Sequence, residues 1–426
     1  MDRRELLRRL GTAAAFPALA TVASRAWAVP PNQTDARFLL VFLRGAYDAN
    51  SLLVPVGSDF YYASRPSIAI RRPVPEGAAA DPLAALALSG NGAAGWGLHP
   101  AVGDKLMPLW RQGQLAFVPF AGTDDLSRSH FETQDSVEAG LPISGDRSIA
   151  GANTAALRGS GFLNRLAGVL GAGAAPVAFT DVLPPSMAGP VNIANVSLKG
   201  STKAPFDDRQ SALFAQMYRD TRFAAVVTEG LELRQTVARE AAAEDSRQQE
   251  MEAASRKAVS ARGFEQEARR MGQLMRDRFN LGFIDVGGWD THVNQGGAQG
   301  QLANLLQNLA GGLSAFADES GAAWGKTVVV VVVSEFGRTF RENGTRGTDH
   351  GHGSTYWVAG GAVRGGRLAG EQVEVRPGTL NQDRDFPVLN EYRGVIGGLL
   401  QRMYGLDTGR IAQVFPGATV QDLGMV

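Results

Sequence analysis

The chain has 426 residues with no Cys, and its 42 basic groups balance 42 acidic groups, so the formal net charge is zero. This balance excludes the strongly basic surface with which many proteins bind nucleic acid, and we expect no nucleic-acid partner. Without Cys there can be no disulfide, iron–sulfur cluster, thiolate nucleophile or Cys-ligated zinc, so any metal ion depends on oxygen and imidazole ligands.

Residues 1–28 have the pattern of an export signal. A charged start is followed by an apolar run at 10–23 and a small-x-small cleavage site at 26–28. The Arg3-Arg4 pair resembles the twin-arginine signal, whose export machinery moves folded proteins. An ordinary secretory signal and an uncut anchor are the alternatives. Cleavage would leave a periplasmic or secreted chain with a net charge of about −3. No later run reaches about 18 apolar residues, so we expect no stable membrane span after signal removal.

Four short apolar runs predict buried strands at residues 37–43, 114–120, 279–286 and 327–333. Strands buried on both faces are typical of parallel sheets. Between the last two runs lies an apolar stripe at helical spacing, which predicts a crossover helix: Leu302, Leu305, Leu306, Leu309, Leu313 and Phe316. The expected fold class is therefore α/β, with a mostly parallel central sheet flanked by helices.

Residues 206–278 differ in composition from the rest of the chain. They are charged and Ala-rich and contain no Pro, with Glu and Arg interleaved. This pattern predicts one or more long helices, inserted as a subdomain or cap within a single α/β domain over residues 29–426. A coiled-coil dimerisation arm is the alternative, although no heptad pattern persists for three or four repeats.

Polar and titratable side chains follow every predicted strand. In open α/β sheets, ligands bind outside the carboxyl ends of the strands, so we expect these side chains to meet at one edge of the sheet. Carboxylate oxygen and neutral imidazole together suit zinc, manganese and similar divalent ions. The alternative for each residue is an ordinary role in a turn. The set comprises Arg44, Asp48, Ser127, Arg128, Ser129, His130, Asp290, His292, Glu335, Arg338, Asp349, His350 and His352.

This distribution resembles the alkaline phosphatase superfamily, in which a parallel sheet carries two metal ions held by Asp and His beside a Ser or Thr nucleophile. The chain resembles more specifically an exported bacterial family, domain of unknown function 1501 (DUF1501). Five segments carry the resemblance: Phe42-Leu43-Arg44-Gly45 with Asp48, Arg128-Ser129-His130-Phe131, Gly288-Trp289-Asp290-Thr291-His292, Ser334-Glu335-Phe336-Gly337-Arg338-Thr339, and Gly347-Thr348-Asp349-His350-Gly351-His352-Gly353.

The resemblance implies an alkaline phosphatase-like fold and roles for individual residues. Asp48, and Asp290 with His292, match metal ligands. The remaining ligand is Asp349 with His350, or Glu335 with His350 or His352 as the later ligand. Ser129 is the proposed nucleophile and Ser127 its competitor, with a helix N-cap as the alternative role of Ser129. Three arginines, Arg44, Arg128 and Arg338, are candidates to bind the equatorial oxygens, or to pair with nearby carboxylates, and His130 joins the catalytic candidates.

These residues predict an exported, metal-dependent hydrolase that acts on a phosphate or sulfate ester, either a small molecule or borne on a polymer. Two divalent ions are expected, zinc or manganese first, with magnesium or calcium as alternatives. A non-catalytic envelope protein that keeps the fold and binds a glycan, lipid or partner protein is the alternative, because the Asp290-x-His292 spacing is shorter than the superfamily's. His99, before Pro100, is expected to have a structural role or to support the metal site.

Overall fold

The computed structural model describes residues 35–142, 159–198 and 264–426, together with scattered residues between 213 and 231. The export signal predicted at 1–28 lies outside the described residues, as does most of the insertion predicted at 206–278. Among the residues that are described, no helix combines the length and the apolar character needed to cross a membrane.

A mostly parallel sheet forms the centre of the described structure, in the order β11-β5-β10-β9-β1-β8-β6-β7, with β12 also paired to β5. Among the described strands of this sheet, β10 alone runs antiparallel to its neighbours. The α/β fold class expected from the sequence is therefore confirmed. The strands are β1 (Arg37–Leu43), β5 (Leu115–Gly122), β6 (Pro176–Ala178), β7 (Ala194–Asn195), β8 (Leu281–Val286), β9 (Val328–Ser334), β10 (Ser354–Ala359), β11 (Arg367–Leu368) and β12 (Asn390–Glu391).

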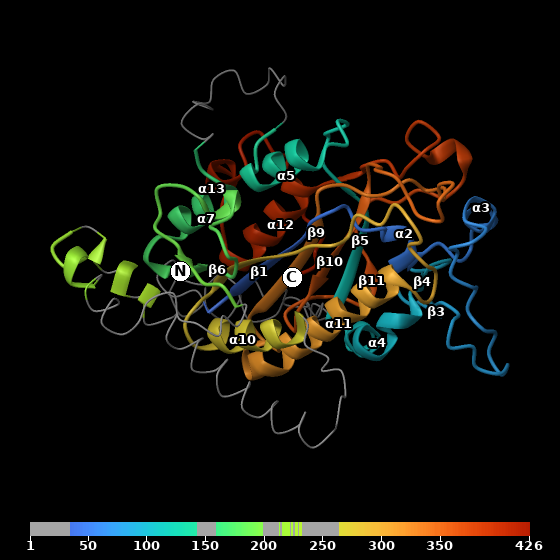
Figure 1. Ribbon diagram of the computed structural model, residues 1–426, viewed down its shortest axis with the longest axis horizontal. Coiled ribbons are helices and arrows are strands. Elements are labelled where there is room, and N and C mark those ends of the chain that lie inside the picture. Colours follow the sequence, from blue (N-terminus) through green and yellow to red (C-terminus); the bar gives the residue numbers. More distant parts are fainter. Residues whose placement is uncertain are drawn as a thin grey trace, which may run out of the picture.

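Helices cover both faces of the sheet, which makes three layers (Figure 1). One face is covered by α4 (Gly103–Arg111), α10 (Phe264–Asp277) and α11 (Gln301–Ser320), and the other by α7 (Phe162–Leu170), α12 (Tyr392–Tyr404) and α13 (Thr408–Val414). α11 is the helix predicted from the Leu stripe. α10, the end of the predicted insertion, packs along α11.

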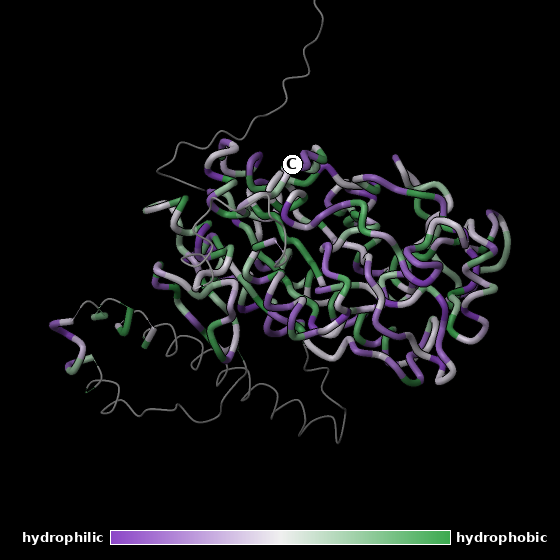
Figure 2. The backbone as a smooth tube through the Cα atoms, turned by 90° about the horizontal axis from the view of Figure 1, so that it is seen from above, coloured by the Kyte–Doolittle hydropathy of each residue, from purple (hydrophilic) through white to green (hydrophobic). Residues whose placement is uncertain are grey.

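A hydrophobic core lies on each face of the sheet, and successive side chains of β1 point alternately into one core and the other. Leu39, Val41 and Leu43 pack on one side of the sheet, whereas Phe38, Leu40 and Phe42 pack on the other. All six are at most 1% exposed. Burial of such a side chain stabilises the fold by about 1.5–3 kcal/mol, so both helical layers are held firmly. In Figure 2, hydrophobic segments cross the body between more hydrophilic loops.

Smaller elements surround the sheet. A second, antiparallel sheet has the order β2-β4-β3, formed by β2 (Leu53–Val54), β3 (Leu86–Ala87) and β4 (Gly97–Leu98). Further α-helices are α2 (Ala49–Leu52), α3 (Asp59–Ser64) and α5 (His130–Ala139). Short 3₁₀ turns are η1 (Pro100–Val102), η3 (Gly171–Gly173), η4 (Pro185–Met187), η5 (Gly321–Ala323) and η6 (Pro377–Thr379).

The strand register brings five loops to one edge of the sheet. Leu43, the last residue of β1, pairs with Val286 of β8 and with Ser334 of β9, so these three parallel strands end together. The antiparallel strand β10 begins at this same edge, where Ser354 pairs with Ala121 near the end of β5. The loops that follow β1, β5, β8 and β9 therefore meet the loop that precedes β10.

Candidate metal centre

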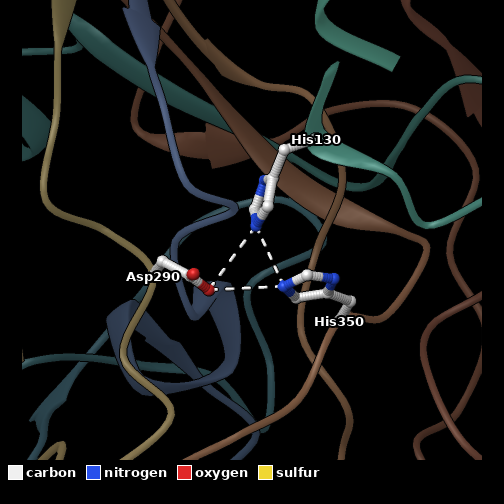
Figure 3. A group of neighbouring side chains, drawn as sticks. All are labelled: His130, Asp290 and His350. Atoms are coloured by element: carbon white, nitrogen blue, oxygen red, sulfur yellow. Dashed lines mark hydrogen bonds and ion pairs between the residues drawn. The ribbon is translucent and has the colours of Figure 1, made fainter. Parts of the chain in front are cut away.

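Three side chains from different loops converge at this edge: His130, Asp290 and His350 (Figure 3). His130 begins α5, Asp290 follows β8, and His350 precedes β10. Their potential ligand atoms all lie within 4.8 Å of one another. The two Nε2 atoms of the histidines are 2.9 Å apart, and Asp290 Oδ1 lies 3.5 Å from that of His130 and 3.3 Å from that of His350.

His292 adjoins this group. Its Nε2 atom lies 2.9 Å from Asp290 Oδ1 and 3.1 Å from His350 Nε2. The sequence-based candidates His130, Asp290, His292 and His350 are thus brought together, although they come from loops up to 220 residues apart in the chain. Glu335, Asp349, Asp48 and His352 are not members of the three-residue group.

The second ring nitrogen of each histidine is held by an oxygen. The Nδ1 atom lies 2.7 Å from Glu335 Oε1 in His130, 3.1 Å from Asp349 Oδ1 in His292, and 3.0 Å from the carbonyl oxygen of Arg128 in His350. Carboxylate and carbonyl oxygens can only accept, so each Nδ1 carries the hydrogen. In the neutral imidazoles, every Nε2 atom then presents a lone pair to the others.

The charges around the group are unevenly distributed. A hydrogen bond with Glu335 raises the pKa of His130, whereas burial lowers the pKa of His350. Burial alone would raise the pKa of Asp290, but the charge and hydrogen bond of Arg338, together with the nearby His292 and His130, lower it overall, so the carboxylate stays ionised at neutral pH.

This donor set fits a divalent metal ion. The Nε2 lone pairs face one another beside an ionised carboxylate, so they repel unless a cation lies among them. A single proton on one Nε2 atom could form a hydrogen bond to only one of the other acceptors. Ligating histidines characteristically donate their other N–H to a carboxylate or carbonyl, which fixes the ring orientation. All three imidazoles here have that partner. Zinc bound at about 2.0–2.1 Å to nitrogen would require only small shifts from these separations.

Glu335 directly follows β9 and is fully buried. Besides His130 Nδ1, its carboxylate accepts from Gln134 Nε2 at 2.9 Å, the amide of Gly45 at 2.8 Å and Ser334 Oγ at 2.9 Å. Burial alone would raise the pKa of Glu335, but hydrogen bonds from His130, Gln134 and backbone amides, including that of Gly45, lower it. The structure thus places Glu335 as the anchor of His130.

Two other predicted ligands have different neighbours. Asp48 is fully buried and forms an ion pair with Arg65, whose Nη1 and Nη2 atoms lie 2.5 and 3.0 Å from the two carboxylate oxygens. His352 is 7% exposed, and its Nδ1 atom has no hydrogen-bond partner in the described structure. Burial lowers the pKa of His352, which favours the neutral ring.

The two candidate nucleophiles differ in their surroundings. Ser129 occupies the N-cap position of α5, but its side chain makes no capping hydrogen bond. Ser127 Oγ accepts from the amide of Ser129 at 3.2 Å and lies 3.4 Å from the hydroxyl of Thr133. The hydroxyl of Ser127 is therefore used within the loop, whereas that of Ser129, next to His130, is not used to cap the helix.

The three predicted arginines form ion pairs with carboxylates. Arg44 contacts Asp285 at 2.6 Å and Glu138 at 2.8 Å, and Arg128 contacts Asp385 at 3.2 Å. Arg338 is fully buried and contacts Asp290 at 2.5 Å. Of the three, Arg338 is thus the one paired with a member of the three-residue group.

Sequence reasoning missed several supporting side chains. Gln134 contacts both Glu335 and Arg44, and its position four residues after His130 on a helix is a signal that could have found it. Arg65, Gln295 and Asn343 also hold carboxylates of this region, but they come from loops with no periodic pattern.

The sequence model of one family matches residues 35–415, and its description is protein of unknown function (DUF1501). A search of curated proteins finds no significant match to this chain. Among solved structures, the chain is similar to a protein in the alkaline phosphatase superfamily from Vibrio parahaemolyticus, with 12% identity and a TM-score of 0.33 over 84% of this chain and 69% of that chain.

Proposed function

The chain belongs to the DUF1501 family, and from this premise we propose that it is an exported, metal-dependent hydrolase of a phosphate or sulfate ester. One observation carries the proposal: the Nε2 atoms of two histidines and the carboxylate of Asp290 converge at the strand edge, with a third imidazole alongside. The ester class follows from the resemblance of the motif segments to the alkaline phosphatase superfamily.

The residues that would hold the ion are His130, Asp290 and His350, with His292 in contact with two of them. A bound divalent ion would supply Lewis acidity toward an ester oxygen and would lower the pKa of a nearby hydroxyl. The protein itself fixes the ligand orientation, because Glu335 and the carbonyl of Arg128 hold the Nδ1 atoms of His130 and His350.

Ser129 is the proposed nucleophile. It is bonded to the ligand residue His130 and immediately precedes α5, whose first-turn amides have no acceptor within the helix. Such a helix start attracts anions, so it is suited to bind an oxygen of the ester while the serine hydroxyl attacks the central atom. In this attack the Ser129 oxygen would bond to phosphorus or sulfur as the bond to the ester's alkoxide breaks, and the hydroxyl proton would pass to the departing alkoxide to give the free alcohol. Water would then cleave the seryl ester, while Glu335 keeps His130 in place as a ligand.

A matched pair of serine variants tests this proposal. We expect the purified protein with zinc or manganese to hydrolyse p-nitrophenyl phosphate or p-nitrophenyl sulfate. Ser129→Ala should lower the turnover by at least about 100-fold with unchanged metal content, and Ser127→Ala should change it much less. Loss of turnover in Ser127→Ala alone would reassign the nucleophile to Ser127.

No turnover of either ester by protein that contains metal would favour the second candidate, a non-catalytic envelope protein that binds a glycan, lipid or partner protein. The export part of the proposal rests on the sequence of residues 1–28, with its Arg3-Arg4 pair and its small-x-small site. Export by the twin-arginine machinery would deliver an already folded, metal-containing protein to the periplasm or the medium.

A further inference from the structure

We propose that this centre binds a single divalent ion, and that the guanidinium of Arg338 permanently takes the place of a second cation beside Asp290 and His292. This inference rests on the metal site of the proposed function and specifies how many ions it holds. It differs from the two-ion site that the resemblance to the alkaline phosphatase superfamily implies.

Arg338 is fixed in position by backbone carbonyl groups. It is fully buried, and its Nε atom donates to the carbonyl of Ala46 at 2.5 Å. Its Nη1 atom donates to Thr348 at 3.1 Å, and its Nη2 atom donates to Gly45 at 2.8 Å and Trp289 at 3.2 Å. These acceptors belong to three separate loops, so the guanidinium cannot move away without breaking contacts to all of them.

The remaining contacts of Arg338 are directed at the metal centre. Its Nη2 atom lies 2.5 Å from Asp290 Oδ1, and its Nη1 atom lies 3.4 Å from His292 Nε2. Asp290 Oδ1 also faces His130 and His350, so a first ion would share this atom with Arg338. His292 Nε2 is the donor atom left for a second ion beside it. A second divalent ion there would share that nitrogen with a fixed, buried positive charge, and repulsion between the two cations opposes its binding.

The other carboxylates of the region already have partners. Asp48 is bound by Arg65, Ser51 and Gln295. Glu335 accepts four hydrogen bonds, and Asp349 Oδ1 accepts from His292 at 3.1 Å and Asn343 at 3.0 Å. We therefore assign Glu335 and Asp349 as positioning residues that orient the imidazoles of His130 and His292, and Asp48 as the partner of Arg65.

The donor set also selects the class of ion. Imidazole nitrogens outnumber carboxylate oxygens among the atoms that converge, and imidazole suits zinc and cobalt better than magnesium or calcium. Cobalt(II) is therefore a suitable probe, because its visible absorption reports the binding of each equivalent directly and needs no substrate.

The test is a titration of metal-depleted, purified protein with cobalt(II), checked by elemental analysis after loading with zinc. We expect saturation at one equivalent per chain. His130→Ala and His350→Ala should each abolish binding, whereas Asp48→Asn and Glu335→Gln should still saturate at one equivalent, the latter with about 10–100-fold weaker affinity. Saturation of the wild type at two equivalents would overturn the inference.

A separate pair of variants tests the role of Arg338. Arg338→Gln removes the charge but keeps donors for the carbonyls, and we expect its cobalt stoichiometry to rise above one. Arg165 also donates to backbone carbonyls, those of Ser160 and Val414, but contacts no member of the metal centre in the described structure. Arg165→Gln is therefore the matched control, and we expect it to bind one equivalent of cobalt. A folded Arg338→Gln protein that still saturates at one would overturn the role of Arg338.

The wild-type titration decides the number of ions whether or not Arg338→Gln folds, and it separates this inference from the proposed function. Two ions would overturn the inference and leave the metal-dependent hydrolase intact. One ion without turnover of any tested ester would support the inference and contradict the proposed hydrolase. No bound ion would overturn both.

Discussion

Gly45 packs against the backbone of Asp290 so closely that a Cβ atom at Gly45 would lie 2.8 Å from the Asp290 nitrogen. Its φ of 116° is in the range that side chains strongly disfavour. Gly45→Ala should therefore both strain the backbone and displace the carboxylate of Asp290. We expect lower thermal stability and weaker metal binding, measured by calorimetry. Gly287 lies at the same edge, and a Cβ atom there would have no neighbouring atom within 4 Å, so Gly287→Ala provides the control.

Removal of the metal should destabilise the protein. The Nε2 atoms of His130 and His350 lie 2.9 Å apart beside Asp290, so their lone pairs repel when no cation lies among them. An ion that binds only the folded state adds about 2.7 kcal/mol to the free energy of unfolding when its concentration is 100 times Kd. The melting temperature should fall after dialysis against a chelator and recover when zinc is added. Identical melting curves in both conditions would contradict the metal site.

Loss of one partner from the buried Asp48–Arg65 ion pair should be costly. Both side chains have no exposed surface, so Asp48→Asn leaves a buried guanidinium without its counter-charge. We expect a decrease of about 3–5 kcal/mol in the free energy of unfolding, measured with urea. The pair of Arg72 and Asp59 is exposed, and Asp59→Asn should have little effect. Equal effects of the two variants would show that burial does not determine the strength of these pairs.

His99 should contribute a pH-dependent part of the stability. It is fully buried, its Nδ1 accepts from the amide of Ala101 at 3.0 Å, and its Nε2 lies 3.1 Å from the carbonyl of Gly297, which fixes a neutral ring. Burial lowers the pKa of His99 in the folded protein. The unfolded chain takes up this proton near pH 6.5, so the stabilisation is present above about pH 6.5 and is lost as the pH falls toward the folded pKa.

Urea denaturation of chelator-treated wild type and His99→Gln at about pH 7.5 and about pH 5.5 measures this effect. His99→Gln should be less stable than the wild type at the higher pH, and the difference should become smaller at the lower pH. A difference that stays constant or grows on acidification would mean that the His99 pKa is not lowered by folding.

The twin-arginine prediction is tested in the producing cell. Arg3→Lys with Arg4→Lys should keep the precursor in the cytoplasm, because this pathway reads the arginine pair. Arg8→Lys with Arg9→Lys removes no residue of that pair and should leave export unchanged. Cell fractionation followed by immunoblotting distinguishes the two. Normal export of the first variant would favour an ordinary secretory signal.

Much of the fold follows from local sequence patterns. Continuous apolar runs correctly predicted β1, β5, β8 and β9, and the Leu stripe correctly predicted α11. A strand buried on both faces, or a helix buried along one side, leaves a recognisable pattern of apolar residues in the local sequence. The family was also predicted from five motif segments, and the match over residues 35–415 confirms it. The strand β10 was missed, since its six residues include Ser and Thr and adjoin a loop rich in Gly.

The amino-acid sequence by itself determined which chemical groups reach the edge of the sheet, because strand ends and the residues after them are local properties. Only the tertiary structure decided how these groups pair. The antiparallel direction of β10 brings His350 back to His130, and the packing of loops far apart in the chain brings Glu335 to His130. The fold also pairs Asp48 with Arg65, 17 residues later. Such pairs join residues up to 220 positions apart, and a single charged residue carries no periodic signal that would identify its partner.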